Sequence, residues 1–186
     1  MGSQLTTFVE QHQGFYQERI TIPLDAMVKR EVDPVTGAPT VVRELFDYWQ
    51  SRRNDAAATM ASFDPRGLFT PEEFRWVAWI DVANSDPLYA LLCKHPARFF
   101  GDWSGKRLLQ YHNYFHARSC ALEYLTCKMV RRPFYHEVRQ TIGDVSRAYT
   151  RLLLPVTDRA GNVTRLYYAI RHIDAIAKMR TPELND

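Results

Sequence analysis

The chain has 186 residues, of which 46% are apolar and 13% aromatic, a composition that excludes a disordered protein and fits one globular domain. The net charge of +3 is too small to indicate a nucleic-acid partner, and no apolar run reaches the roughly 18 residues needed to span a membrane. We find no basic-then-apolar leader, and three cysteines without a CxxC pair favour a reducing, cytoplasmic location.

Residues 1–40 are predicted to form an N-terminal extension to the main domain. Ile20 and Ile22 alternate with polar residues, but Pro23 restricts any strand there to a sheet edge. Turn-forming residues at 33–37 then separate this segment from the main domain. The extension either packs against the domain or projects from it.

An amphipathic helix is predicted after the extension. Val42, Leu45, Phe46 and Trp49 recur at helical spacing, which indicates roughly three turns with one apolar face. A second helix is predicted to begin at Thr70, because the sequence Thr-Pro-Glu-Glu supplies an N-cap hydroxyl, a proline in the first turn and acids near the positive end of the helix dipole.

The main domain is predicted to contain two strands, a helical region and three further strands. The elements, in order, are strands at 76–82 and 88–95, a short helix at 97–100, a long helix from 106 or 113 to 130, a strand at 135–142 and a hairpin at 149–173. This order predicts an α+β fold with a five-stranded antiparallel sheet and helices on one face. The domain would span 41–174, followed by a tail at 175–186.

The closing hairpin determines which side chains face the core of the predicted sheet. Its loop at 158–162 contains Gly161, which tolerates the positive φ of a tight turn. Folding the chain about Ala160 pairs Leu154 with Leu166, Leu152 with Tyr168, and Thr150 with Ile170. Because side chains alternate along a strand, this register places an arginine and tyrosine face outward. That face comprises Tyr149, Arg151, Leu153, Arg165, Tyr167, Ala169 and Arg171.

Five segments together resemble the short, stand-alone PAS-domain proteins of proteobacteria. They are LFDYWQSRR at 45–53, FRWVAWIDV at 74–82, DPLYALLC at 86–93, DWSGKRL at 102–108 and LLLPVTDRAGNVTRLYYAI at 152–170. The chain departs from the family pattern between 92 and 100, where Lys94-His95-Pro96 stands in place of a glycine-containing segment.

The resemblance implies a non-enzymatic sensory or adapter domain. PAS folds hold a small ligand, or nothing, between the helices and the inner sheet face, and they report through the outer face and the flanking helices. We therefore expect a protein partner or a homodimer to contact the outer sheet face and the N-terminal helix. The predicted interface residues are Trp49, Arg151, Leu153, Arg165 and Tyr167.

The ligand is expected between the long helix and the sheet. The predicted binding residues are Tyr111, Phe115, Arg118, Leu122, Leu154 and Tyr168. Arg118 interrupts the apolar line of the helix, and a buried guanidinium needs an anionic partner, which favours an anionic small molecule. Alternatively the helix is rotated, and Arg118 lies at its edge, solvated or paired with Glu123.

Other reactive residues on the long helix have two interpretations each. The spacing of His112 and His116 suits a metal or, by the resemblance, haem, but it also suits polar residues near a helix start. Cys120 and Cys127 share one face as either a redox pair or core residues. We predict no catalytic or metal site, and the sequence leaves the cofactor unknown.

Two further functions remain open at the level of sequence. A ketosteroid-isomerase-like α+β cone would be an enzyme and would need an acid on the pocket wall, for which Asp81 or Glu137 are candidates. A structural domain would instead fill its own cavity with Trp76, Trp79, Phe115 and Tyr168.

Overall fold

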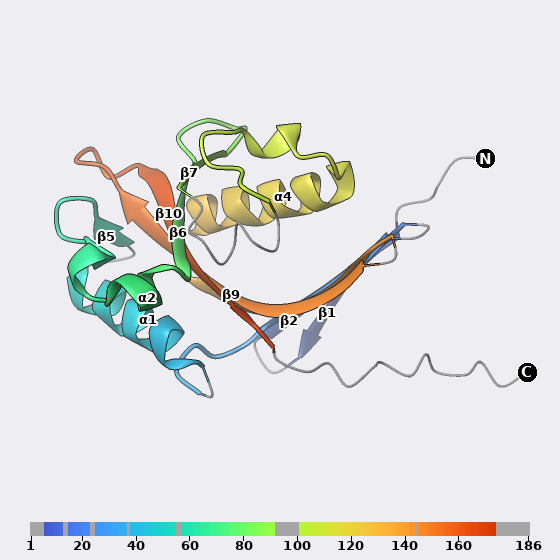
Figure 1. The fold of residues 1–186 in the computed structure, drawn as a ribbon, viewed down its shortest axis with the longest axis horizontal. Coiled ribbons are helices and arrows are strands. Elements are labelled where there is room, and N and C mark those ends of the chain that lie inside the picture. Colours follow the sequence, from blue (N-terminus) through green and yellow to red (C-terminus); the bar gives the residue numbers. More distant parts are fainter. Residues whose placement is uncertain are drawn as a thin grey trace, which may run out of the picture.

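The protein is an α+β protein in which helices pack on both faces of a curved, mainly antiparallel sheet (Figure 1). The computed structural model describes residues 6–12, 15–22, 25–36, 38–54, 57–91, 101–143 and 145–173. No helix in these ranges combines the length and the apolar character needed to cross a membrane.

The strands and helices have these bounds. The strands are β1 (Thr6–His12), β2 (Phe15–Ile22), β3 (Asp25–Glu31), β4 (Arg53–Asn54), β5 (Ala57–Thr59), β6 (Val77–Asp81), β7 (Leu88–Leu91), β8 (Phe134–Ile142), β9 (Val145–Thr157) and β10 (Val163–His172). The helices are α1 (Thr40–Arg52), α2 (Pro71–Phe74) and α4 (Tyr114–Val130), with 3-10 turns η1 (Pro65–Gly67) and η2 (Leu108–Gln110).

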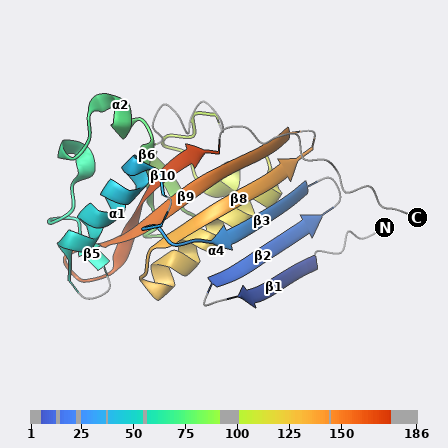
Figure 2. The same cartoon turned by 90° about the horizontal axis from the view of Figure 1, so that it is seen from below.

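The sheet has the strand order β1-β2-β3-β8-β9-β10-β6-β7. All five predicted strands lie in it, and the last three are adjacent to the first two. Helix α4 lies on the concave side of the sheet, whereas α1 lies on the other side (Figures 1 and 2). The long helix α4 thus covers one face, and the N-terminal helix α1, which was predicted separately, covers the second face. The end of the second predicted strand and the short helix at 97–100 lie outside the described residues.

The N-terminal segment adds strands to the same sheet. Strand β3 pairs with β8 from Asp25 opposite Ile142 to Glu31 opposite His136, and β2 and β1 continue the sheet beyond it. Figure 2 shows these three strands extending the sheet past β8. Residues 25–31 thus share a core with the main domain.

Strand β9 lies at the centre of the sheet and is covered on both faces. All its residues from Arg151 to Thr157 are buried. Along one edge of β9, the pairing with β8 ends at Leu153 and the pairing with β5 begins at Val156. Pro155 therefore lies between the two paired stretches. A proline is tolerated there because its missing N–H interrupts neither ladder.

The register of the closing hairpin differs from the prediction by one residue. Val163 pairs with Thr157, as folding about Ala160 requires, but Arg165 pairs with Val156, which leaves Thr164 as an extra residue in a β-bulge. Beyond the bulge Leu154 pairs with Tyr167 instead of Leu166. The loop prediction itself is confirmed, since Gly161 has φ of 82°.

The bulge reverses the two faces of β9. Tyr149, Arg151 and Leu153 face α4, whereas Leu152 and Leu154 pack with α1. Strand β10 keeps its predicted faces, with Leu166, Tyr168 and Ile170 toward α4. A one-residue shift has this effect because successive side chains of a strand point to opposite faces.

The predicted amphipathic helix α1 is confirmed, and it anchors the second core. Val42, Leu45 and Trp49 have no exposed surface, and the Trp49 indole N–H donates to the Pro155 carbonyl oxygen at 2.9 Å. Helix α2 begins with the predicted cap, in which Thr70 and Glu73 form a reciprocal capping box.

We predict that Trp49→Ala lowers the free energy of unfolding by about 3–5 kcal/mol, because it leaves a cavity and removes the hydrogen bond to Pro155. Chemical denaturation measures this loss. The matched control is Gln50→Ala on the exposed face of the same helix, which should change stability by less than about 0.5 kcal/mol. Equal effects of the two variants would contradict the packing described for α1.

Candidate functional site

Helix α4 brings the reactive residues of the long-helix region under the sheet. The Asn113 side chain caps its N-terminus by accepting from the His116 N–H at 2.7 Å, and Arg131 in the left-handed conformation ends it. The face that meets the sheet carries small and polar residues. They are His116, Ala117, Ser119, Cys120, Glu123, Tyr124 and Cys127.

The helix is rotated relative to the ligand-facing prediction. Arg118 is exposed, and its guanidinium donates to the Tyr114 hydroxyl at 3.1 Å. Leu122 is 54% exposed. These two predicted binding residues therefore face away from the sheet. Periodicity could not predict this, because apolar side chains lie on all sides of α4 and do not mark its inner face.

Glu123 is the centre of a buried ionic cluster. Its Oε2 accepts from the Lys29 ammonium at 2.8 Å and from the Arg151 guanidinium. Its Oε1 lies 2.7 Å from Nδ1 of His136. The four side chains come from α4, β3, β9 and β8, and all are at most 2% exposed. One carboxylate thus joins the N-terminal strand, the long helix and the centre of the sheet.

Arg151 was expected on an outer interface, and the structure corrects this. The bulge turns it toward α4, where Nη1 lies 3.4 Å from both the Cys120 sulfur and the Tyr124 hydroxyl. Its Nε has no hydrogen-bond partner among the described residues. Arg151 therefore occupies the buried position beside the cavity that was considered for Arg118.

The pKa of Glu123 reflects two opposing effects. Burial alone raises the pKa of this carboxyl, but the positive charges of Arg151 and Lys29, together with His136, outweigh burial and hold it well below its ordinary value. Glu123 is consequently ionised at neutral pH. Two cations, Lys29 and Arg151, then face one carboxylate, so the cluster carries excess positive charge.

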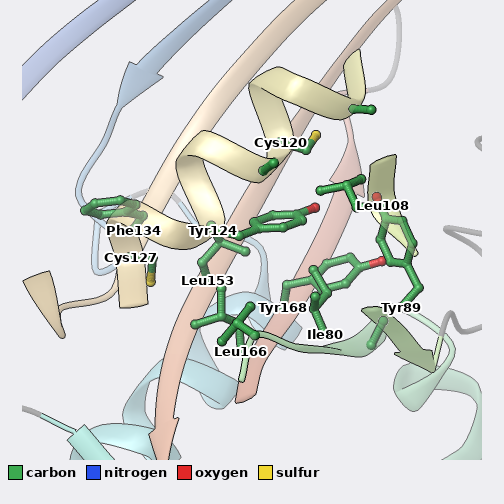
Figure 3. Close-up of a cluster of buried hydrophobic side chains, with 14 of the residues drawn as sticks. Ile80, Tyr89, Leu108, Cys120, Tyr124, Cys127, Phe134, Leu153, Leu166 and Tyr168 are labelled. Atoms are coloured by element: carbon green, nitrogen blue, oxygen red, sulfur yellow. The ribbon is translucent and has the colours of Figure 1, made fainter. Parts of the chain in front are cut away.

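A small cavity of about 20 Å³ lies beside this cluster. It is lined by Tyr89, Trp103, Tyr111, His116, Tyr124, Arg151, Tyr168 and Ile170. Figure 3 shows Tyr89, Tyr124 and Tyr168 pointing toward one another from β7, α4 and β10. The volume admits about one water-sized molecule.

Cys120 pairs with His116, which is one of the residues that line this cavity. The Cys120 sulfur lies 3.5 Å from His116 Nε2 and is fully buried. Burial raises the pKa of the thiol, but the charges of His116, Arg151 and Lys29 outweigh it and bring the pKa of Cys120 to about 6. The other ring nitrogen of His116 lies 3.2 Å from Gln140 Oε1.

Cys127 on the same helix has the opposite environment. Its thiol donates to the Arg132 carbonyl oxygen at 3.3 Å. Burial and the nearby charge of Glu123 raise the pKa of this thiol above its ordinary value. Both Cys120 and Cys127 are buried, as the interpretation of these cysteines as core residues requires. Cys93 lies outside the described residues.

The remaining predicted ligand residues fall on different sides of the sheet. Tyr111 and Tyr168 line the cavity, and Phe115 is buried in the same core. Leu154 is on the opposite face with α1, so its assignment to the pocket floor is corrected by the bulge.

The predicted interface is covered by the chain itself. Trp49, Leu153 and Tyr167 are buried, Arg151 is in the ionic cluster, and Arg165 is half-buried over the Trp79 ring at 5.7 Å. Helix α1 and the segment after it occupy this face, as the edge-to-face contact of Phe63 with Tyr167 illustrates. The outer sheet face is therefore core, and its assignment as an interface is corrected.

The two acids considered for an enzyme lie away from the cavity lining, whereas of the two histidines considered for a metal only His116 lines it. Asp81 accepts from the Ala83 N–H at 2.9 Å, and Glu137 pairs with Arg30 and Arg139. His112 is exposed while His116 is buried. Within the described ranges, no three or more histidine, cysteine or acidic side chains are grouped to hold a metal ion.

No protein-family model, curated protein or solved structure matches the chain. Function must therefore be inferred from the chemistry of the site itself.

The ionic cluster was missed at the sequence level, although it left a signal. Arg151 interrupts the otherwise apolar run before Pro155, and Glu123 interrupts the apolar residues of α4. Opposite charges isolated in two apolar segments indicate a buried pair, because a lone charge is costly to bury.

We predict that Glu123→Gln destabilises the protein by about 3–5 kcal/mol at neutral pH, because it leaves two cations buried without their anion. The folded pKa of Glu123 lies below the ordinary value of 4.5, so its stabilisation is present above that value and is lost as the pH falls below it. Denaturation curves from acidic to neutral pH should show the two proteins converging in acid. Glu137→Gln, at a more exposed ion pair, should cost at most about 1 kcal/mol; equal costs at Glu123 and Glu137 would contradict a central role for the cluster.

Proposed function

We propose that this chain is a non-enzymatic sensory domain of the PAS type that binds a small anion between α4 and the sheet. The chain order supports this proposal: β6 and β7 precede α4, and β8, β9 and β10 come after it within one sheet. Strand β8 leads through β9 and β10 to β6 and β7, with α4 on one face of these strands.

The observation that carries the proposal is the position of Arg151. Its guanidinium is buried and lines the cavity, and its Nε has no hydrogen-bond partner among the described residues. An unsatisfied buried donor is costly, and a bound acceptor removes that cost. Because guanidinium bonds to anions are strong, an anion is the acceptor that this site favours most.

The charge of the cluster favours the same ligand. Lys29 and Arg151 share Glu123, so that carboxylate neutralises only one of their two positive charges. A monovalent anion in the cavity would neutralise the other. The alternative counterion is the thiolate of Cys120, which lies 3.4 Å from Arg151.

The cavity limits the size of the ligand. At about 20 Å³ it admits about one water-sized species, so a halide fits it best, with Tyr111 and Tyr168 at its wall. A nucleotide or a larger organic acid does not fit without opening of the site. We accordingly propose chloride as the first probe, and azide, nitrite and formate as probes of whether the site opens for an anion of three heavy atoms.

Helix α4 connects the cavity to the surface. Its inner side carries His116 and Tyr124 of the cavity wall, whereas Tyr114, Leu122 and Met129 on its outer side are exposed. A displacement of α4 on binding would therefore reach the surface directly. We propose this helix, in place of the covered outer sheet face, as the route by which a protein partner senses the ligand.

We predict that chloride, or another probe anion, raises the Tm of the wild-type protein in a manner that requires Arg151. An anion at ten times its Kd adds about 1.4 kcal/mol, which corresponds to about 3–6 °C for a chain of this length. Differential scanning fluorimetry at constant ionic strength measures the shift. Arg151→Met should lose it, because that variant removes the guanidinium and keeps the length of the side chain.

Arg118→Ala is the matched control, because it removes the same charge from the exposed side of α4. It should respond like the wild type. Sulfate is the second control. It is too large for the cavity but stabilises proteins in general, so any rise in Tm that it causes does not come from binding in the cavity. If Arg151→Met does not fold, Arg151→Lys keeps the charge but not the planar donors and should weaken the shift. Equal shifts in wild type and folded Arg151 variants would overturn anion binding and favour a domain whose cavity serves packing alone.

A further inference from the structure

Cys120 differs from the other described cysteine in the groups that surround it. The thiol contacts His116 Nε2 at 3.5 Å and Arg151 Nη1 at 3.4 Å, and both of these side chains line the cavity. Cys127 faces Glu123 and donates to a carbonyl oxygen. One helix thus carries two buried thiols, one among cations and one beside an anion.

We propose that Cys120 is a site of oxidation at which hydrogen peroxide converts the thiol to a sulfenic acid. The inference shares Arg151 and the cavity with the proposed anion site, but it does not require that an anion binds there. It rests on a nucleophile, a proton acceptor and a cation that meet beside a space of about 20 Å³.

His116 is oriented to take the thiol proton. Its Nδ1 lies 3.2 Å from Gln140 Oε1, which also accepts from the Tyr149 hydroxyl at 3.3 Å. Because this oxygen is an acceptor, the ring proton lies on Nδ1 and the lone pair of Nε2 faces Cys120. The resulting thiolate is the form of cysteine that attacks a peroxide.

Arg151 stabilises the charge that develops in the reaction. Its Nη1 is 3.4 Å from the sulfur, and its buried Nε has no hydrogen-bond partner among the described residues. A fixed cation beside a reacting oxygen in a dry site is an effective form of electrostatic stabilisation. Lys29 and Tyr124 add to this environment, since Lys29 lowers the pKa of the thiol and the Tyr124 hydroxyl shares Nη1.

The titratable groups around Cys120 come from several elements. They are Lys29 on β3, Tyr89 on β7, His116, Glu123 and Tyr124 on α4, His136 on β8, Tyr149 and Arg151 on β9, and Tyr168 on β10, with Tyr111 just before α4.

The proposed step is balanced in atoms and electrons. The Cys120 sulfur attacks one oxygen of hydrogen peroxide, an S–O bond forms and the O–O bond breaks. The sulfur is oxidised by two electrons, which reduce the peroxide. The departing hydroxide takes the proton that His116 accepted from the thiol and leaves as water, so thiol and peroxide become sulfenic acid and water.

Cys127 cannot resolve the product into a disulfide. The two residues are seven positions apart on a helix, which separates their Cα atoms by about 10 Å. A disulfide requires less than about 7 Å. The sulfenic acid should therefore persist long enough to be trapped by a cyclic 1,3-dione.

The test uses the full chain, reduced, freed of reductant and treated with hydrogen peroxide and the dione at neutral pH. Trypsin releases both thiols on one peptide, after Arg118 and after Lys128, so fragment ions assign the label to Cys120 or Cys127. We predict that Cys120 is labelled at least about ten times faster than Cys127, because only a thiol of lowered pKa is largely ionised at pH 7. In guanidinium chloride, where the chain is unfolded, the two rates should become equal.

Two variants test the mechanism. His116→Gln should slow labelling of Cys120 about tenfold, because the thiol loses its proton acceptor, with circular dichroism showing that the variant is folded. His112→Gln, at the exposed neighbouring histidine, should leave the rate unchanged.

Native labelling of Cys120 that is absent, or no faster than that of Cys127, would overturn the proposal. This comparison needs no variant, so it stands if His116→Gln does not fold. A folded His116→Gln variant with unchanged labelling of Cys120 would equally overturn it. Such a result would not count against anion binding, because thiol labelling and the Tm shift are separate measurements.

Discussion

The arrangement of the protein depends on a single buried carboxylate. Glu123 on α4 accepts from Lys29 and Arg151 and contacts His136, and these partners come from three strands of the sheet. A buried charge without partners is prohibitively costly, so the four groups must be brought together or none can be buried. The cluster therefore fixes the rotation of α4 and the position of β3 against the helix.

The same cluster gives the interior its chemical character. Two cations beside one carboxylate make an electropositive core, in which the thiol of Cys120 and the cavity beside Arg151 lie. The proposed anion binding and the proposed thiol reactivity would both follow from this arrangement of charges. On the other face of the sheet, α1 packs Trp49 against β9. Side chains of β9 therefore contribute to both hydrophobic cores.

The sequence supported a large part of the fold but not the site. Helix α1, the cap of α2 and the five predicted strands arise from periodicity and local hydrogen bonding, which are short-range properties. The faces of β9 could not be predicted, because the strand is apolar on both sides and a bulge at Thr164 shifts its register. Because of this one-residue shift, Arg151 lies beside Glu123 in the buried cluster and not on the outer surface where it was predicted.

The sequence by itself determined the apolar face of α1, the cap of α2 and which hairpin closes the sheet. Tertiary structure alone decided which side of α4 is buried, because Leu122 and Met129 are as apolar as the core yet face outward. It also decided that Lys29, in a segment read as an extension, lies beside Glu123. Such pairings join residues about ninety positions apart, and they arise from the need to neutralise a buried charge, which local patterns do not encode.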